Sequence, residues 1–357
     1  MSSLAKAIET GDLTQLPSRR DEDWRWTDLR GLLRTLPPAY EPKPGYGGFD
    51  VVRDGQSWRA PFEAKRRIAF LNGHPSGLAV EPYLLRFDVY DPVVALETML
   101  IGSVSVSSAL KVVVPAGLSA VLLESHVGDG AHVTSLSLDI TVEEGARLER
   151  IVVADDDREA VRVVEATVTL APNAHYAQTI LTSGARRQRI ETRVSHPGQG
   201  ATVRLDGAYL LHDQRHADTT SVVTHAGLGG VTSQLTKGVV DGQARGVFQG
   251  RIVVERGADQ TDARMGHHAL ILSDKAEIDA KPELLIFADD VQCAHGNTVG
   301  ALDENALFYA QQRGMPFETA RAMLTEAFVG EVVDRIEHEG AREIAAAWVA
   351  EQLGRGQ

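Results

Sequence analysis

Apolar and polar residues alternate strictly through the middle of the chain, from about residue 111 to residue 287. In residues 135–142 every second side chain is apolar, namely Leu136, Leu138, Ile140 and Val142. Residues 163–170 and 247–254 repeat this alternation. A period of two is typical of β-strands that bury one face. The pattern therefore predicts a mainly β protein.

The turns between these segments are also repetitive. A small or polar residue followed by alanine recurs at Gly145-Ala146, Asn173-Ala174, Gly200-Ala201, Gln243-Ala244, Gly257-Ala258 and Lys275-Ala276. The first two intervals, counted from the turn residue, are 28 and 27 residues. Strands that cannot bury a face alone stack as coils, which predicts a parallel β-helix, or β-solenoid. A β-sandwich is the alternative, but about 180 residues without helical periodicity exceed a typical sandwich of about 100.

The flanks of this core have other patterns, which divides the chain into three predicted domains. These are a mixed N-terminal α/β domain over residues 1–105, a β-helix core over residues 106–300 and a C-terminal helical domain over residues 301–357. In the first domain, Asp91 followed by Pro92 predicts a helix from Pro92 to about Ile101, because proline fits the first helical turn and aspartate caps it.

Helical periodicity begins after Gly300. Asp303 can cap one helix and Pro316 opens a second, with a third over residues 341–353. The second carries one apolar stripe, formed by Ala320, Met323, Leu324, Ala327, Phe328, Val332 and Ile336. Such a stripe packs on the solenoid or receives a partner, and packing is the simpler interpretation.

The net charge narrows the choice of partners. With 36 Lys and Arg against 49 Asp and Glu, the formal charge is −13. This charge repels phosphate backbones and anionic headgroups, so we expect neither nucleic acid nor membrane as a partner. The start of the chain has no apolar signal region, and no stretch reaches the roughly 18 apolar residues of a membrane span. We therefore expect a cytoplasmic protein.

Familiar catalytic motifs are missing from the sequence. Residues 229–237 contain glycine and lysine, but the spacing of a P-loop fails, so we expect no ATP hydrolysis by this chain. The sequence also lacks H-E-x-x-H, paired C-x-x-C and G-x-S-x-G. The prediction is a protein that is not an enzyme. The alternative is a β-helical carbohydrate-active enzyme, although no secretion signal or obvious carboxylate constellation supports it.

The chain has one cysteine, Cys293, which fits a reducing compartment and cannot alone hold zinc or an iron-sulfur cluster. On a strand, Cys293 and His295 emerge on the same face, where thiolate and imidazole can bind a soft or borderline metal or hold sulfur. The competing interpretation makes Cys293 a small buried residue and His295 a polar strand end. Leu284 and Ile286 have the other parity, so either a bulge intervenes or Cys293 faces away from their core.

Other histidines are weaker candidates. His212 and His216 have a metal-binding spacing only on a helix. His225 is expected to be a hydrogen-bonded strand residue. His267 and His268 are adjacent, so on a strand they face opposite sides and cannot chelate one ion together.

Four ordered motifs resemble one known family. They are residues 234–241 (QLTKGVVD), 246–250 (GVFQG), 281–300 (KPELLIFADDVQCAHGNTVG) and 307–314 (LFYAQQRG). Together they are similar to the SufB/SufD family of iron-sulfur cluster assembly scaffolds, and residues 22–27 (EDWRWT) resemble its N-terminal element. The single cysteine followed by His295 resembles the SufD branch. His267 and His268 stand where an Asn-containing stretch is expected, so no role is transferred to them.

The resemblance implies a function and partners. A SufB-type paralogue would pair with this chain, and a SufC-type ABC ATPase would dock on the C-terminal helices near Phe308, Met323, Leu324 and Phe328. His295, with Cys293, would complete an iron or sulfur site shared with SufB, so that iron or a transient cluster is handled and no cofactor is stably bound alone. Whether the isolated chain is a monomer or a homodimer stays open, as does any role of flavin.

Overall fold

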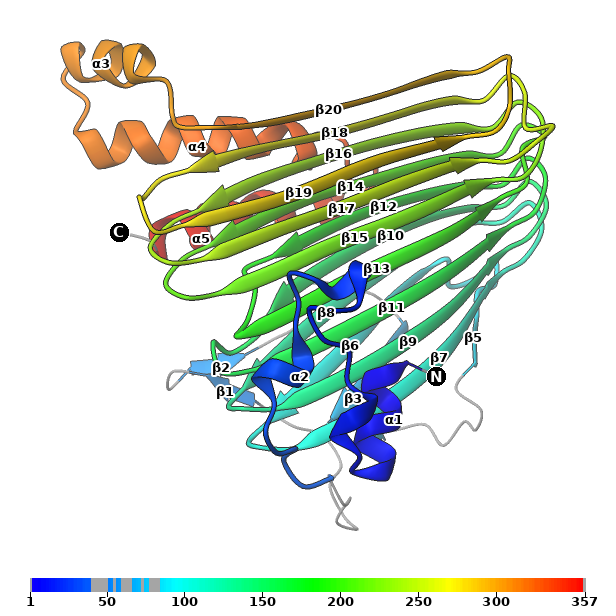
Figure 1. Cartoon of the computed structure of the whole chain (residues 1–357), viewed down its shortest axis with the longest axis horizontal. Helices are drawn as coiled ribbons and strands as arrows, with labels where there is room; N and C mark the ends of the chain where they lie inside the picture. Colours follow the sequence, from blue (N-terminus) through cyan, green and yellow to red (C-terminus); the bar gives the residue numbers. More distant parts are fainter. Residues whose placement is uncertain are drawn as a thin grey trace.

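The computed structural model describes residues 2–39, 51–53, 56–58, 66–71, 74–76 and 84–355 of the 357-residue chain. Its body is a parallel β-solenoid built from two long sheets (Figure 1). An N-terminal segment lies on one sheet, and C-terminal helices lie on the other (Figure 1). The predicted class, a mainly β protein with a β-helix core and a C-terminal helical region, is confirmed.

The first sheet has ten strands in the order β20-β18-β16-β14-β12-β10-β8-β6-β3-β4, parallel except between β3 and β4. They are β3 (Arg66–Leu71), β4 (His74–Ser76), β6 (Val93–Ile101), β8 (Ser119–Asp129), β10 (Arg147–Asp155), β12 (His175–Thr182), β14 (Thr202–Leu211), β16 (Val231–Val240), β18 (Asp262–Ile271) and β20 (Gln292–Gly300).

The second sheet has eight parallel strands in the order β19-β17-β15-β13-β11-β9-β7-β5. They are β5 (Leu84–Arg86), β7 (Ser105–Val114), β9 (Val133–Val142), β11 (Val161–Leu170), β13 (Arg187–His196), β15 (His216–His225), β17 (Arg245–Val254) and β19 (Glu277–Ile286). A separate antiparallel pair joins β1 (Val51–Arg53) to β2 (Gln56–Trp58). From β5 onward, successive strands alternate between the two large sheets, so each coil adds one strand to each.

The repeated turn motif marks the corners of the coils. Arg147 pairs with His175, and His175 with Thr202, so these coils repeat after 28 and 27 residues as the sequence predicts. At the corners Gly145 and Asn173 have left-handed backbones, with φ of 65° and 57°, which glycine and asparagine tolerate best. The alanine after each turn is buried, because only a small side chain fits inside the corner; they are Ala146, Ala174, Ala201, Ala244, Ala258 and Ala276.

The solenoid interior is apolar over most of its length but also contains charged side chains. The central cluster includes Leu122, Leu148 and Val152. Beside them the Arg150 guanidinium donates to both carboxylate oxygens of Glu124, at 2.6 and 2.8 Å, and both side chains are fully buried. A buried ion pair of this kind is stable only while each charge keeps its partner.

The helix predicted from Pro92 to about Ile101 is wrong, because these residues form strand β6. Val94 and Leu96 point into the solenoid core, and the strand pairs in parallel with β8. Pairing and burial of β-branched residues therefore override the local capping signal of Asp91 and Pro92. Strand pairing in both sheets thus begins before the predicted core start at residue 106.

The N-terminal segment covers the outer face of the eight-stranded sheet. It contains α1 (Ser3–Thr10), the short 3-10 helices η1 (Leu13–Gln15) and η2 (Glu22–Trp24), and α2 (Leu29–Leu32). Leu4, Leu16 and Leu29 are buried together with Val133 of β9 and Val163 of β11. Apolar contact therefore attaches this segment to the sheet.

Three C-terminal helices follow β20: α3 (Glu304–Gln312), capped by Asp303 as predicted, α4 (Phe317–Val333) and α5 (Glu339–Arg355). Helices α4 and α5 cover the outer face of the ten-stranded sheet, whereas α3 projects beyond it (Figure 1). Of the predicted stripe, Ala320, Val332 and Ile336 are fully buried, while Met323 is 45% exposed. Among the described residues, no helix combines the length and apolar character needed to cross a bilayer.

Candidate functional site

The last coil leaves one end of the solenoid open. Strands β19 and β20 are the terminal strands of their sheets, and no strand in the described part of the chain pairs with their outer edges. We call this surface, formed by β19 and β20, the open end. Exposed strand edges present free backbone N–H and C=O groups to a further strand.

Strand register shows which β20 side chains belong to the open end. Cys293 pairs with Ala263 of β18, and His295 pairs with Met265. Ala263 and Met265 are buried inside the solenoid, and paired residues of parallel strands point the same way. Cys293 and His295 therefore share the inner face of β20, which no further coil formed by the described residues covers.

The two side chains differ in exposure. Cys293 is half-buried against the cluster that includes Phe248 and Met265, whereas His295 is exposed. Burial raises the pKa of the Cys293 thiol, which favours its protonated form until a metal ion displaces the proton. Among the described residues, no three His, Cys, Asp or Glu side chains group as a metal site. The Cys293 thiol and the His295 imidazole are the two side chains on this face of a type that binds metal or sulfur.

The parity mismatch between Leu284 and Cys293 comes from a corner of the coil. Both side chains contact the same apolar cluster. Strand β19 ends at Ile286 and β20 begins at Gln292, so the non-strand residues 287–291 reset the alternation. Cys293 therefore faces the same core as Leu284.

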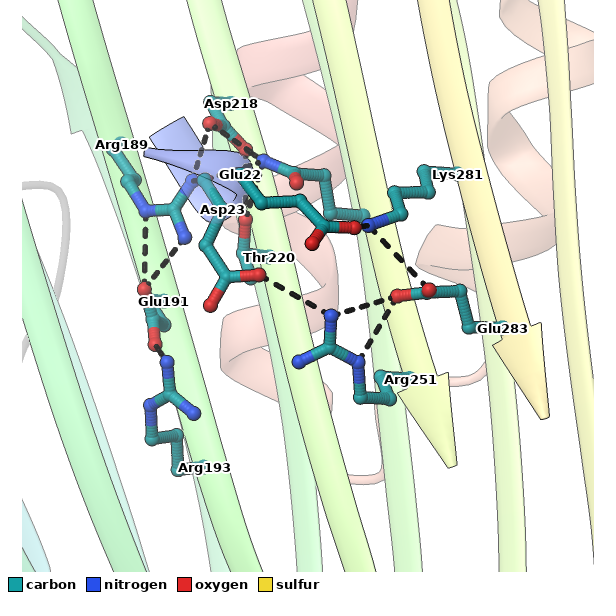
Figure 2. Close-up of polar contacts among 11 residues, drawn as sticks. Glu22, Asp23, Arg189, Glu191, Arg193, Asp218, Thr220, Arg251, Lys281 and Glu283 are labelled. Atoms are coloured by element: carbon teal, nitrogen blue, oxygen red, sulfur yellow. Dashed lines mark hydrogen bonds and ion pairs between the residues drawn. The ribbon is translucent and has the colours of Figure 1, made fainter. Parts of the chain in front are cut away.

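The N-terminal element over residues 22–27 is held on the outer face of the strands nearest the open end (Figure 2). Arg189 of β13 donates to the Asp23 carbonyl oxygen at 2.7 Å and lies 4.5 Å from the Trp24 ring centroid. Arg251 of β17 bridges the carboxylates of Asp23 and Glu283, at 3.2 and 2.9 Å (Figure 2). These contacts connect the segment to strands from β13 to β19.

Asp218 of β15 is the central acceptor of this network. Its carboxylate accepts hydrogen bonds from Arg189 at 2.7 Å and from Thr220 at 2.8 Å (Figure 2). It also accepts a hydrogen bond from the hydroxyl of Thr27. At the terminal strand, Lys281 donates to Glu22 at 2.7 Å. The segment thus reaches the outer side of β19.

Asp218→Asn should therefore release the N-terminal element. The substitution keeps the shape but removes the charge that pairs with the buried Arg189, at a cost of about 1–3 kcal/mol. We expect limited proteolysis within residues 18–27 to accelerate about tenfold, since 1.4 kcal/mol changes the open population by that factor. Asp139→Asn, an exposed position on the same sheet, is the control. Equal cleavage of both variants would contradict this role.

The opposite face of the solenoid holds helix α4 by charge. Lys237 of β16 pairs with Glu331 at 2.7 Å and lies 4.5 Å from the Phe328 ring centroid. Asp241 pairs with Arg321. The QLTKGVVD motif therefore fixes α4 to the ten-stranded sheet.

The four residues proposed to contact an ATPase differ in exposure. Phe308 and Met323 are 62% and 45% exposed, whereas Leu324 and Phe328 are half-buried against the fold. Tyr309 and Phe317, which sequence reasoning did not single out, are 60% and 46% exposed. Tyr309 could have been found from the sequence, because it follows Phe308 directly in the LFYAQQRG motif. Since β20 runs from Cys293 toward α3, the part of this patch on α3 lies beyond the far end of the strand (Figure 1).

The remaining histidines mostly have structural contacts. His225 hydrogen-bonds Thr232 at 2.9 Å, as predicted for a strand residue. The buried His216 donates to the Trp26 carbonyl oxygen, and burial lowers its pKa to about 3. His267 is fully buried, while His268 faces outward and hydrogen-bonds Thr298 at 2.7 Å. The opposite orientation predicted for this last pair is confirmed.

Comparison with known proteins agrees with these features. Residues 100–328 match the family model described as SUF system FeS cluster assembly, SufBD core domain. The matched range covers more than half of the chain, including both strands of the open end and the start of α4.

Relatives of several lineages align with the same region. The chain is 30% identical to the iron-sulfur cluster assembly protein SufD of Escherichia coli over 244 residues, 67% of this chain and 57% of that protein. It is 29% identical to Protein ABCI7, chloroplastic, of Arabidopsis thaliana over 63% of this chain and 48% of the relative. The alignments thus span about half the length of these two relatives. A SufBD family protein of Mycobacterium bovis is 25% identical, and that alignment covers 96% of this chain and 90% of the relative. Solenoid, motifs and alignments together identify the chain as a member of the SufB/SufD family of iron-sulfur cluster assembly proteins.

Proposed function

We propose that this chain is a non-catalytic, cytoplasmic scaffold subunit in iron-sulfur cluster assembly, which pairs with a SufB-type paralogue and binds a SufC-type ATPase. The observation that carries the proposal is the open end, where Cys293 and His295 lie on an uncovered terminal strand. Clusters are held mostly by cysteine thiolates, with histidine an occasional replacement. The chain can supply two donors at this surface, so a partner would supply the others to the iron or cluster, which is cargo.

The shape of the open end supports pairing with another solenoid. A partner with its own exposed strands can extend both sheets by backbone hydrogen bonds. Leu285, Ile286 and Phe287 next to that edge are 42%, 41% and 60% exposed. Their apolar area would be buried by such a partner.

The C-terminal patch supports docking of the ATPase. Phe308, Tyr309, Phe317 and Met323 are exposed on α3 and the first half of α4, and aromatic residues and methionine are enriched in protein interfaces. The charge contacts of α4 with β16 would carry nucleotide-driven movement of the ATPase to the sheet that ends at β20. Cross-linking across the open end should then depend on nucleotide.

Affinity purification of the tagged full chain from its native cells tests both contacts. Masses of a SufB-type paralogue and of an ABC ATPase should be recovered with the wild-type chain. Phe308→Asp combined with Met323→Asp should reduce the recovered ATPase at least tenfold, because a carboxylate is costly to bury in an interface. Val299→Arg, at a 45% exposed position of β20, should reduce the paralogue by a similar factor.

Matched controls separate these effects from damage to the fold. Tyr90 and Val89 are 86% and 73% exposed in the loop before β6, so Tyr90→Asp and Val89→Arg should leave both partners bound. Recovery of both partners at wild-type levels by the α3–α4 and β20 variants would contradict the proposal.

One observation favours the alternative of a carbohydrate-active enzyme. A groove of about 1090 Å³ on the eight-stranded sheet is lined by several polar residues, including Asp139, Glu165 and Glu191. Glycoside hydrolysis uses a pair of available carboxylates. The carboxylate of Glu191 is already paired with both Arg189 and Arg193, so Asp139 and Glu165 would have to form that pair. Release of sugars from an acidic polysaccharide by the purified chain would support this alternative.

A further inference from the structure

His267 lies directly beneath the open end, in the last coil that another strand covers. Its side chain is fully buried, and its ring stacks on Phe248 with centroids 4.6 Å apart and planes inclined by 2°. Burial lowers the pKa of His267 to about 4, so the imidazole is neutral near pH 7. A neutral imidazole has one N–H donor and one nitrogen acceptor.

Both ring nitrogens of His267 are hydrogen-bonded. Nδ1 lies 2.7 Å from Oδ1 of Asn297 on β20, and Nε2 lies 2.8 Å from the hydroxyl of Tyr209 on β14. The amide oxygen of Asn297 can only accept, so Nδ1 carries the proton. Nε2 is then the acceptor, and the Tyr209 hydroxyl donates to it. The two bonds therefore have one direction, from Tyr209 through His267 to Asn297.

Neighbouring glycines hold Tyr209 in place. A Cβ atom at Gly238 would lie 2.1 Å from Cζ of the tyrosine ring, and one at Gly246 would lie 2.5 Å from its Cε2. Tyr209 is fully buried, so the ring fills the space that these glycines leave. The solenoid therefore fixes Tyr209, the inner end of the hydrogen-bonded series Tyr209–His267–Asn297.

This chain of contacts orients the Asn297 amide. Because Oδ1 is turned toward His267, the Nδ2 group is directed away from that bond, and no described residue accepts from it. Asn297 is exposed and lies two positions beyond His295 on the same face of β20, which places the two about 7 Å apart along the strand. A group bound to His295 would therefore lie next to the Asn297 side chain on this face of β20.

We propose that Asn297 is a third recognition residue of the open end, which donates hydrogen bonds to an anionic sulfur group held beside His295, and that His267 and Tyr209 are positioning residues for its amide. This inference rests on the proposed function. Burying histidine and tyrosine costs desolvation that an apolar pair would avoid. Hydrogen bonds to sulfur from outer groups are among the factors that tune iron-sulfur centres, and an amide N–H donor suits sulfide, persulfide or thiolate.

The first test uses the full chain alone. With ¹⁵N-labelled histidine, the signals of His267 are identified by their loss in His267→Gln. We expect the Nδ1–H tautomer at neutral pH in the wild-type chain and also in Tyr209→Phe, because the Nδ1–H bond to Asn297 remains. In Tyr209→Phe the Nε2 signal should shift, because this nitrogen loses the hydroxyl that donates to it. An Nε2–H tautomer in the wild-type chain would overturn the proposed direction of the hydrogen bonds.

The second test uses the complex with the SufB-type partner, reconstituted with Fe²⁺ and sodium sulfide. Asn297→Asp should lower retained sulfide about tenfold, because a carboxylate repels anionic sulfur and donates no amide hydrogen. Tyr209→Phe should lower it severalfold without loss of partner binding. Thr298→Val, at the neighbouring position that faces the other side, is the matched control and should retain wild-type sulfide.

The outcomes separate this inference from the proposed function. Loss of sulfide in His295→Ala but not in Asn297→Asp would overturn the inference and leave the proposed function intact. Retention in both variants would reject the inference together with the ligand role of His295, whereas the scaffold role is tested separately by recovery of the two partners. If Asn297→Asp does not join the complex, Asn297→Ser, which is smaller and uncharged, takes its place. Retention of sulfide at the wild-type level by Asn297→Ser would also overturn the inference.

Discussion

Glu124→Ala should lower the free energy of unfolding by about 3–5 kcal/mol, because it leaves the Arg150 guanidinium charged and unpaired inside the solenoid. Both carboxylate oxygens of Glu124 accept from Arg150, and neither side chain has any exposed surface. Burial alone would raise the pKa of Glu124, yet the neighbouring Arg150 charge holds it at about 2. Arg150 also donates to Gln178 at 2.7 Å, a contact that cannot replace the lost charge.

Chemical denaturation measures this effect, and a double variant provides the control. Glu124→Leu with Arg150→Met removes both charges at similar volume, and such replacements of buried pairs are often neutral or stabilising. We therefore expect the double variant to be within about 1 kcal/mol of the wild-type chain or above it. A loss below 1 kcal/mol for Glu124→Ala would show that the pair contributes little.

His295→Ala should reduce the iron retained by the assembled complex by at least tenfold. The reason is that His295 is the exposed nitrogen donor on the inner face of β20, and altering even the groups that support a metal ligand costs 10–100-fold in affinity. Iron content and the visible absorption of the cluster measure the loss. Binding of the two partners should persist, because the strand edges of the open end and the C-terminal patch on α3 and α4 are unchanged.

His212→Ala is the control for this second variant. His212 lies at a coil corner and contacts Asp213 at 3.0 Å, away from the terminal strand. It should retain wild-type iron. Unchanged iron in His295→Ala would remove the ligand role while leaving the scaffold role in place.

The strands were predictable because burial of one face imposes a period of two along the whole core. The coil length was predictable because each corner needs a turn residue followed by a small side chain, as at Gly145-Ala146 and Asn173-Ala174. The incorrect prediction of a helix from Pro92 to about Ile101 has a physical origin. A helix start is a local signal, whereas parallel pairing of β6 with β8 depends on residues nearly 30 positions away.

The buried charges could be inferred only in part. Glu124 shares the parity of Leu122, and Arg150 shares that of Leu148 and Val152, so the alternation already placed charge on the inner face. Their pairing joins adjacent coils, 26 residues apart in sequence. Neighbouring residues along the chain do not determine such a contact.

The same limit applies to the candidate site. The shared face of Cys293 and His295 follows from their spacing on a strand, which the register of β20 bears out. The hydrogen bond between His267 and Asn297 joins residues 30 positions apart, and sequence reasoning assigned no role to His267. Long-range contacts of this kind depend on how the coils stack.

The uncovered edges of β19 and β20 also bear on how a cell must produce this subunit. A parallel sheet that stops without a cap can template any extended segment that reaches it, including another orphaned copy. Surplus chains would be vulnerable to end-to-end polymerisation until a companion occupies the edge. Synthesis of this chain in balance with the proposed partner would thus protect it from polymerisation.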